Sequence, residues 1–464
     1  MIIYYEVLVV GLAAAVFVYY KCRASLIYAL VPAFLTLPVA LAGNSMNAGI
    51  FPIHLSMLAV IFRLSQPHTL YKIVFNRFSV CAYGIVLIAL AHVPIGEFTR
   101  FSTYGTLNLI LSIIFLGAIY YGRQTSVDSG AGMKTFLICA MLYSLACIIH
   151  NLNIVDLSAK YYFGPRLADI TMSMGTAYLF LASYKITTGG LLTISVFCAI
   201  ASLFRGGNKT LGVACLALLS FALLLTNSRT DLVALAVSLI FLQLLLYPGA
   251  FLVVIMEIFF VVAMFLMTTP DMILSIIETL GLSDEEGQRF VQIFSGDVEN
   301  SSAAGRLNDV IAVPRFIVTQ PLRLFIGQGF GNFRVLQETG VAENAFGHNI
   351  YLNYFGELGL PGLVLLICLI VMLMSVPVSR LFKVKRIQAN KAFAARFTAI
   401  AVAFWIDRLI AGCTADVIFY YDGTAAYSLA MVMMLGMGLT VARQLDRGRH
   451  AAMRYQGVGG KTVP

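Results

Sequence analysis

Long apolar runs, repeated along almost the whole chain, constrain this sequence more than any other feature. Runs of roughly 18–20 apolar residues have the length of a helix that crosses the hydrocarbon core of a bilayer. Of the 464 residues, 60% are hydrophobic and only 11% are charged, whereas a soluble domain has about 25% charged residues. Runs such as Leu232–Leu246 lack the strict polar and apolar alternation of a barrel strand. The sequence therefore predicts an all-α polytopic membrane protein.

Hydropathy divides the chain into fourteen candidate spans, from which we expect about 12–14 transmembrane helices. The candidates are 2–20, 24–43, 51–65, 78–94, 105–122, 134–150, 169–184, 188–204, 210–226, 231–247, 249–267, 359–377, 396–412 and 424–441. The first candidate has its basic residues after the apolar run, which is typical of a span and not of a cleaved signal peptide. We expect N-terminal transmembrane helices in 1–267, a periplasmic loop with short helices in 268–348, C-terminal transmembrane helices in 349–442 and a basic cytoplasmic tail in 443–464.

The basic residues predict the orientation of the chain. The net charge is +9, but the basic residues cluster in short loops beside apolar runs, where they set membrane orientation, so no nucleic-acid partner is implied. Clusters at 380–386 and 443–454 predict that these segments are cytoplasmic and that 268–348 lies outside. The positive-inside rule also predicts that the basic loops of the N-terminal half are cytoplasmic. Counting the candidate spans back from the C-terminal clusters, however, would put these loops outside. We therefore expect one candidate span before residue 226 to be merged, re-entrant or miscounted.

The segment 268–348 is the one long stretch without membrane character. It holds ten of the 22 acidic residues, five arginines and no lysine. A loop of this length in an ordered protein is usually functional, and helical patterns at 284–293 and 306–317 favour order. The alternative is a solvated cap without chemistry, because loops also vary freely.

Four polar motifs lie in or beside this segment. They are Asn227-Ser-Arg-Thr-Asp231, Ala304-Gly-Arg306 with Arg315 further along the same helix, Gly327-Gln-Gly-Phe-Gly-Asn-Phe333, and Gly347-His-Asn-Ile-Tyr351. Each has a structural interpretation. Arg229 is a lipid anchor or a partner of Asp231, and Arg306 and Arg315 balance the charge of the acidic loop. The glycines form a tight turn and not a phosphate loop, and His348 is a structural histidine.

Taken together, the motifs favour chemistry on a lipid diphosphate. Arginines that converge on one membrane face offer planar, permanently charged groups for phosphate oxygens. A histidine nearby offers a base with a pKa near neutrality. Glycosyl transfer from a lipid diphosphate needs both, because the leaving diphosphate gains negative charge while the acceptor hydroxyl loses a proton.

In this order, and with Glu357-Leu-Gly-Leu-Pro-Gly362 beginning nine residues after His348, the motifs resemble the O-antigen ligase and O-antigen polymerase superfamily. The resemblance covers about residues 210–380. It implies a C-type glycosyltransferase-like membrane fold of the bacterial inner membrane, with a periplasmic site for undecaprenyl-diphosphate-linked glycan and without a metal or other cofactor. It also implies His348 as the catalytic base and Arg229, Arg306 and Arg315 as diphosphate ligands.

Several other polar residues have open roles. Asn349, Tyr351 and Glu357 are candidate supporting residues, and for Glu357 we favour a hydrogen bond to loop backbone over contact with a substrate hydroxyl. Asp407 and Arg408 interrupt an apolar run and are either functional or an ion pair that fixes packing. Glu257 interrupts another apolar run.

The expected function is that of an inverting membrane glycosyltransferase. Its partners are a lipid-linked oligosaccharide donor, a glycan or lipid-glycan acceptor and membrane lipids. A repeat-unit polymerase of O-antigen or exopolysaccharide is slightly favoured over a ligase that transfers glycan to lipid A core. A secondary transporter or lipid-linked glycan flippase is a further alternative, but the sequence lacks the internal repeats that transporters tend to show.

Overall fold

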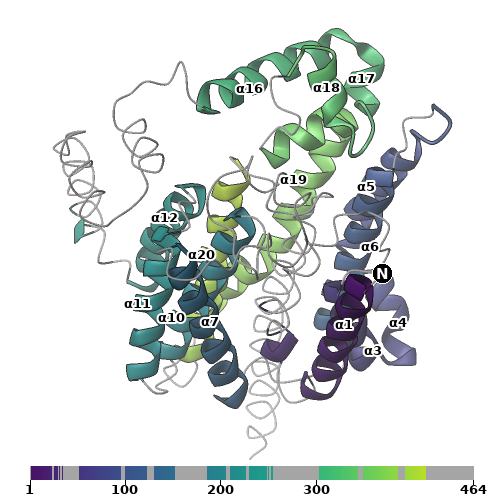
Figure 1. Ribbon diagram of the computed structural model, residues 1–464. Helices are drawn as coiled ribbons and strands as arrows, with labels where there is room; N and C mark the ends of the chain where they lie inside the picture. Colours follow the sequence, from purple (N-terminus) through teal and green to yellow (C-terminus); the bar gives the residue numbers. More distant parts are fainter. Residues whose placement is uncertain are drawn as a thin grey trace, which may run out of the picture.

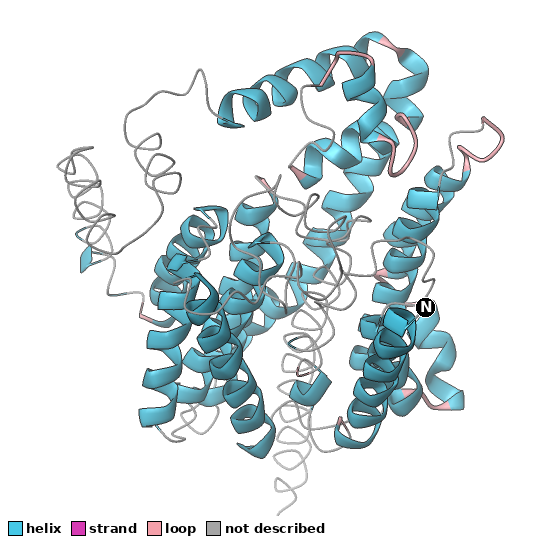
Figure 2. Cartoon of the chain, viewed as in Figure 1, coloured by secondary structure: helices cyan, strands magenta, loops and turns pink. Residues whose placement is uncertain are grey.

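The computed structural model of the protein describes helices from both halves of the chain (Figure 1). The described residues are 2–22, 26–29, 52–95, 100–122, 130–151, 185–204, 209–225, 229–247, 302–342, 349–384 and 392–413, with single positions at 31, 34, 249, 252, 253 and 256. Within these ranges all regular secondary structure is helical (Figure 2).

The described membrane helices form two groups that α19 connects (Figure 1). The first group contains α1 (Ile2–Lys21), α3 (Pro52–Leu64), α4 (Pro67–Val74), α5 (Ser79–Leu90) and α6 (Arg100–Tyr121), with the short helix η1 (Leu26–Ala29). The second group contains α7 (Gly130–Asn151), α10 (Lys185–Phe204), α11 (Lys209–Leu225), α12 (Arg229–Leu246) and α20 (Ala392–Gly412).

Helix α19 (Ile350–Val384) packs on α5 of the first group and on α20 of the second. At Gly84 of α5 a Cβ atom would lie 2.9 Å from Cδ1 of Leu365 of α19, so the absence of a side chain lets the two helices approach closely. Small residues commonly allow such approach between membrane helices. A continuous apolar core includes residues of both groups and of α19.

Three helices form a cap at one end of the bundle: α16 (Ser302–Thr319), α17 (Pro321–Ile326) and α18 (Phe333–Glu338). The cap has a small apolar core of its own, to which α16 contributes Val313 and Ile317, α18 contributes Leu336, and the first turn of α19 contributes Leu352. Because this core includes α19, the cap is fixed to the start of that helix. We call this end of the bundle the cap end.

Length and composition agree with a membrane-spanning bundle. Ala131–Ile149 and Ile350–Ser379 are long and apolar enough to cross a bilayer, and Pro67–Val74 with Ser79–Leu90 adds a third span if this pair, bent by 58°, is counted as one. Six shorter apolar helices of 10–17 residues accompany them in the described part of the chain. The prediction of an all-α membrane protein is confirmed.

The bend between α4 and α5 occurs at Asn76. Its side-chain oxygen accepts hydrogen bonds from the backbone N–H groups of Phe78 (2.9 Å) and Ser79 (3.1 Å), and its Nδ2 donates to Ile73 O at 2.9 Å. This is how an asparagine ends one helix and starts another, because it satisfies the exposed backbone groups of both. The candidate spans 51–65 and 78–94 left 66–77 as a connection between them, so α4 was not predicted.

Basic residues of both halves lie at the end of the bundle opposite the cap. The guanidinium of Arg63 lies 5.1 Å from the ring centroid of Tyr19, that of Arg77 lies 5.6 Å from Tyr120, and that of Arg396 lies 5.2 Å from Phe204. These aromatic residues all belong to the last turns of their helices. The described helices thus show no conflict of charge parity between the two halves.

Helix α11 packs on both α7 and α10. The thiol of Cys215, the seventh residue of α11, donates to the carbonyl oxygen of Leu137, the eighth residue of α7. The candidate span 169–184, which precedes α10, lies outside the described residues. The expectation that one span before residue 226 is merged, re-entrant or miscounted therefore stays a prediction.

Most predicted spans with described residues match observed helices within a few residues, but α19 begins at Ile350 and not at 359. Its backbone leaves helical geometry at Gly359, where φ is 68° and ψ is −169°. Glycine and proline near this break concealed the first nine residues of the helix from hydropathy. The candidate 424–441, most of 24–43 and of 249–267, and the loop helix at 284–293 lie outside the described residues.

Candidate functional site

The sequence-predicted site residues differ in how much the structure describes. Arg229 is the first residue of α12, and Arg306 is in the second turn of α16, but the described side chains do not include these two. His348 lies outside the described residues, directly before Asn349. The site is therefore described from the helices that carry these residues and from the side chains next to them.

Asn349 starts α19 and ties it to α20. Its Oδ1 accepts hydrogen bonds from the backbone N–H groups of Tyr351 (3.0 Å) and Leu352 (3.1 Å), which is the geometry of a helix N-cap. Its Nδ2 donates to the carbonyl oxygen of Cys413 at 3.0 Å. The hydroxyl of Tyr351 donates to the carbonyl oxygen of Leu409 at 3.4 Å. The residue that follows His348 is thus held by the last turns of α20.

The glycine motif forms a tight turn that packs against the break in α19. Gly327, Gly329 and Gly331 have φ values of 74°, 99° and 83°, which side chains strongly disfavour. The backbone N–H of Gln328 donates to Gly356 O, and that of Gly329 donates to Glu357 O, each at 2.9 Å. The motif is therefore a packing turn within the cap.

Glu357 is buried under this turn. Its Oε2 accepts a hydrogen bond from Gly331 N at 2.9 Å, and its Oε1 accepts one from Phe333 N at 3.3 Å, at the start of α18. Negative charge at a helix N-terminus is favourable because the N–H groups there point toward it. Glu357 thus hydrogen-bonds loop backbone, the role that sequence reasoning favoured.

The same turn fixes the cap to α6. The carbonyl oxygen of Phe330 accepts a hydrogen bond from Ser102 Oγ, and the ring of Phe330 lies 5.8 Å from that of Tyr354 between centroids. Phe330 is 1% exposed and belongs to the core of the bundle. The cap therefore contacts the first group of helices as well as α19.

The two arginines of α16 occupy opposite sides of that helix. Positions 306 and 315 are nine residues apart, which is half a turn from a common face at about 100° per residue and about 13 Å along the axis. Val313 and Ile317 are buried, and position 306 lies on their side, whereas Arg315 is exposed. The structure does not bring Arg315 to the face that carries position 306.

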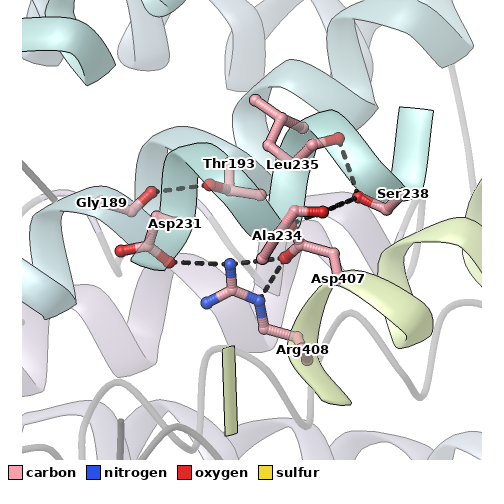
Figure 3. Close-up of polar contacts among 8 residues, drawn as sticks. All are labelled: Gly189, Thr193, Asp231, Ala234, Leu235, Ser238, Asp407 and Arg408. Atoms are coloured by element: carbon pink, nitrogen blue, oxygen red, sulfur yellow. Dashed lines mark hydrogen bonds and ion pairs between the residues drawn. The ribbon is translucent and has the colours of Figure 1, made fainter. Parts of the chain in front are cut away.

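Figure 3 shows a buried charged cluster between α12 and α20. The Arg408 Nη2 lies 2.9 Å from Asp231 Oδ1, and its Nε lies 2.5 Å from Asp407 Oδ2. Ser238 Oγ lies 3.4 Å from Asp407 Oδ1. All four residues are 0% exposed. The cluster is an interhelical ion pair, one of the two interpretations given to Asp407 and Arg408.

Sequence reasoning missed the role of Asp231 in this cluster. It paired Asp231 with Arg229 because they are neighbours, while the described partner lies 177 residues further along the chain. The available signal was charge complementarity between two apolar helices, each interrupted by ionisable residues. The residues that the structure describes contain no group of three or more His, Cys, Asp or Glu side chains placed to hold a metal ion.

A comparison with protein-family models finds a match in the central segment of the chain. Residues 214–367, about a third of the chain, match the family model described as O-Antigen ligase. The match runs from α11 to the middle of α19 and includes Arg229, Arg306 and His348. No curated protein matches the chain. Over this segment the chain is similar to the O-Antigen ligase family.

Proposed function

We propose that this protein is an inverting membrane glycosyltransferase. It transfers the oligosaccharide of an undecaprenyl-diphosphate-linked donor to an acceptor glycan at the periplasmic face of the bacterial inner membrane. The observation that carries the proposal is the O-antigen ligase match over the segment with all four polar motifs. The cap end is the proposed periplasmic end, because basic residues of both halves lie opposite it.

The geometry of the helix ends supports one site at the cap end. The start of α12 contacts α20 through Asp231 and Arg408, and the start of α19 contacts α20 through Asn349 and Cys413. Residues 408 and 413 are five apart on α20, or about 7 Å along its axis. Arg229 and His348 therefore adjoin residues that meet at the end of the same helix.

In the proposed reaction an acceptor hydroxyl attacks the anomeric carbon of the donor sugar. The new bond joins the acceptor oxygen to that carbon, and the bond from the carbon to the diphosphate oxygen breaks. His348 takes the hydroxyl proton, while Arg229 and Arg306 stabilise the charge on the departing diphosphate. Because the two guanidinium groups supply positive charge directly, the proposal needs no divalent metal.

Arg315 is not part of the proposed diphosphate site. Its side chain is exposed, and the nine residues between it and position 306 correspond to half a turn of an ideal helix. Arg315 therefore offers a control of the same residue type on the same helix.

The acceptor separates two versions of the proposal. A repeat-unit polymerase joins one lipid-linked oligosaccharide to another, and this is the version we put forward. The description of the matching family, O-Antigen ligase, favours the second version, in which the acceptor is lipid A core.

The test uses the purified protein in lipid nanodiscs with a lipid-linked repeat unit as donor. Arg229→Lys and Arg306→Lys should each impair transfer, because an ammonium cannot reproduce the bidentate contacts of a guanidinium. Arg315→Lys should retain wild-type transfer. Full activity of both the Arg229 and the Arg306 variant contradicts the proposed site. Products lengthened by whole repeat units indicate a polymerase, whereas transfer only to added lipid A core indicates a ligase.

A further inference from the structure

The buried cluster of Asp231, Asp407 and Arg408 lies next to the proposed site without belonging to it. Asp231 is in the first turn of α12, two residues after Arg229. The guanidinium of Arg408 contacts both carboxylates, one from each helix (Figure 3). The cluster thus joins the start of α12 to α20 through directional bonds.

Packing alone does not require this arrangement. Charges removed from water lose several kcal/mol of solvation each, and apolar residues of similar volume often pack equally well or better. Such clusters are best attested as devices that fix the register between elements. On α12 a shift of one residue would rotate every side chain by about 100°. Such a shift would break the contact of the Arg408 guanidinium with Asp231 while its contact with Asp407 stays on α20, so the pair of contacts opposes the shift.

The same end of α20 also fixes α19. Leu409 and Cys413 accept hydrogen bonds through their carbonyl oxygens from Tyr351 and Asn349, at the start of the helix that follows His348. The end of α20 therefore holds the starts of both α12 and α19, which are more than 100 residues apart in the chain. A rotation of α12 against α20 is also a displacement of Arg229 from the start of α19.

We infer that Arg408 is a positioning residue, which acts through Asp231 to orient Arg229 toward the diphosphate of the lipid donor. The inference rests on the proposed function, because it takes Arg229 as a diphosphate ligand. A misplacement of about 1 Å can cost on the order of 100-fold in rate, so an effect without direct ligand contact is physically sufficient.

The experiment measures binding of undecaprenyl diphosphate to the nanodisc-embedded protein. The first variant, Arg229→Ala, removes the proposed ligand. The second, Asp231→Asn/Asp407→Asn/Arg408→Gln, removes the three charges together, so that neither carboxylate remains charged after the guanidinium is lost. The third combines both changes. Arg396→Gln, at the other end of α20 and packed over Phe204, is the matched control.

We expect Arg229→Ala to raise the Kd about tenfold or more, the loss typical of a charge-assisted hydrogen bond. The neutral cluster should raise the Kd similarly, and the combined variant should bind no more weakly than Arg229→Ala alone. The control should bind as wild type. Wild-type affinity of the neutral cluster, or a combined loss equal to the product of the two separate losses, overturns the inference.

The Arg229→Ala variant tests the proposed function separately from the positioning role. Wild-type affinity of this variant contradicts the diphosphate role of Arg229, and the positioning role of Arg408 with it. Arg408→Lys provides a second route if the neutral cluster is not monodisperse, because lysine keeps the charge but cannot contact two carboxylates with a planar fork. It should show the same non-additivity with Arg229→Ala, and additive losses overturn the inference equally.

Discussion

Gly327→Ala should detach the glycine turn from α19, and Gly340→Ala provides a matched control. Gly327 has φ 74° and ψ −159°, a combination that is essentially restricted to glycine. A Cβ atom there would lie 2.2 Å from the backbone carbon of Glu357. Gly340 has a similar φ of 72°, but a Cβ atom there would meet nothing within 4 Å. The two substitutions share conformational strain, and only the first adds a clash.

The contacts give the size of the effect. Carbon atoms approach to about 3.5 Å, so the added atom forces the turn away from α19 by roughly 1 Å or more. The bonds from Gln328 N to Gly356 O and from Gly329 N to Glu357 O, now 2.9 Å each, then fall outside hydrogen-bond distance. At about 1 kcal/mol per bond, their loss adds about 2 kcal/mol to the about 1–3 kcal/mol of backbone strain.

Hydrogen exchange measured by mass spectrometry tests this expectation. Loss of about 2 kcal/mol of local stability should speed exchange of the amides at 328 and 329 by about 30-fold. Gly340→Ala should leave these amides protected. Equal protection of the turn in the two variants would refute the reasoning, since it would mean that the added Cβ atom does not separate the turn from α19.

Three further predictions concern the membrane arrangement, the metal and the start of α19. In a protein without its native cysteines, single cysteines introduced at Ser301 and Asp422 should react with an impermeant maleimide from outside, and one at Gln388 should not. Labelling at 388 in intact cells would contradict the predicted orientation. Glycan transfer should survive EDTA, and a loss that Mg²⁺ or Mn²⁺ restores would contradict charge compensation by arginines. Asn349→Ala should lower the free energy of unfolding by about 1 kcal/mol, because the helix cap is lost. Asn349→Asp keeps the Oδ1 acceptor, so it should lower the free energy of unfolding by less. Thermal unfolding in detergent compares the two variants.

Sequence reasoning predicted those features of this protein that depend on local pattern. Apolar runs gave the all-helical membrane fold because a bilayer leaves few other solutions for backbone polar groups. Glycine spacing predicted the turn at Gly327–Gly331, and the observed φ values show the local reason. The start of α19 was missed because residues around the break at Gly359 interrupt the apolar pattern that hydropathy follows.

Features that depend on pairing between distant helices could not be predicted in this way. Asp231 has Arg229 as a charged neighbour two residues away, but residues at this spacing do not face each other on a helix. The direction of Asp231 toward Arg408 depends on how α12 and α20 pack, which no local pattern encodes. The separation of Arg306 and Arg315 could have been read from their spacing, since nine residues place them on opposite sides of one helix.

The family match and the physical contacts define different boundaries for the candidate site. The matched segment ends at residue 367, yet Arg408 and Cys413, which hold the starts of α12 and α19, lie beyond it. A segment limited to 214–367 would retain Arg229, Arg306 and His348 while losing the helix that fixes two of them relative to each other. Removal of Arg408 would also leave Asp231 as a buried carboxylate without its described partner, a change that typically costs about 3–5 kcal/mol. We therefore expect that a protein shortened to 214–367 loses the proposed transfer activity, and that a minimal active protein includes α20.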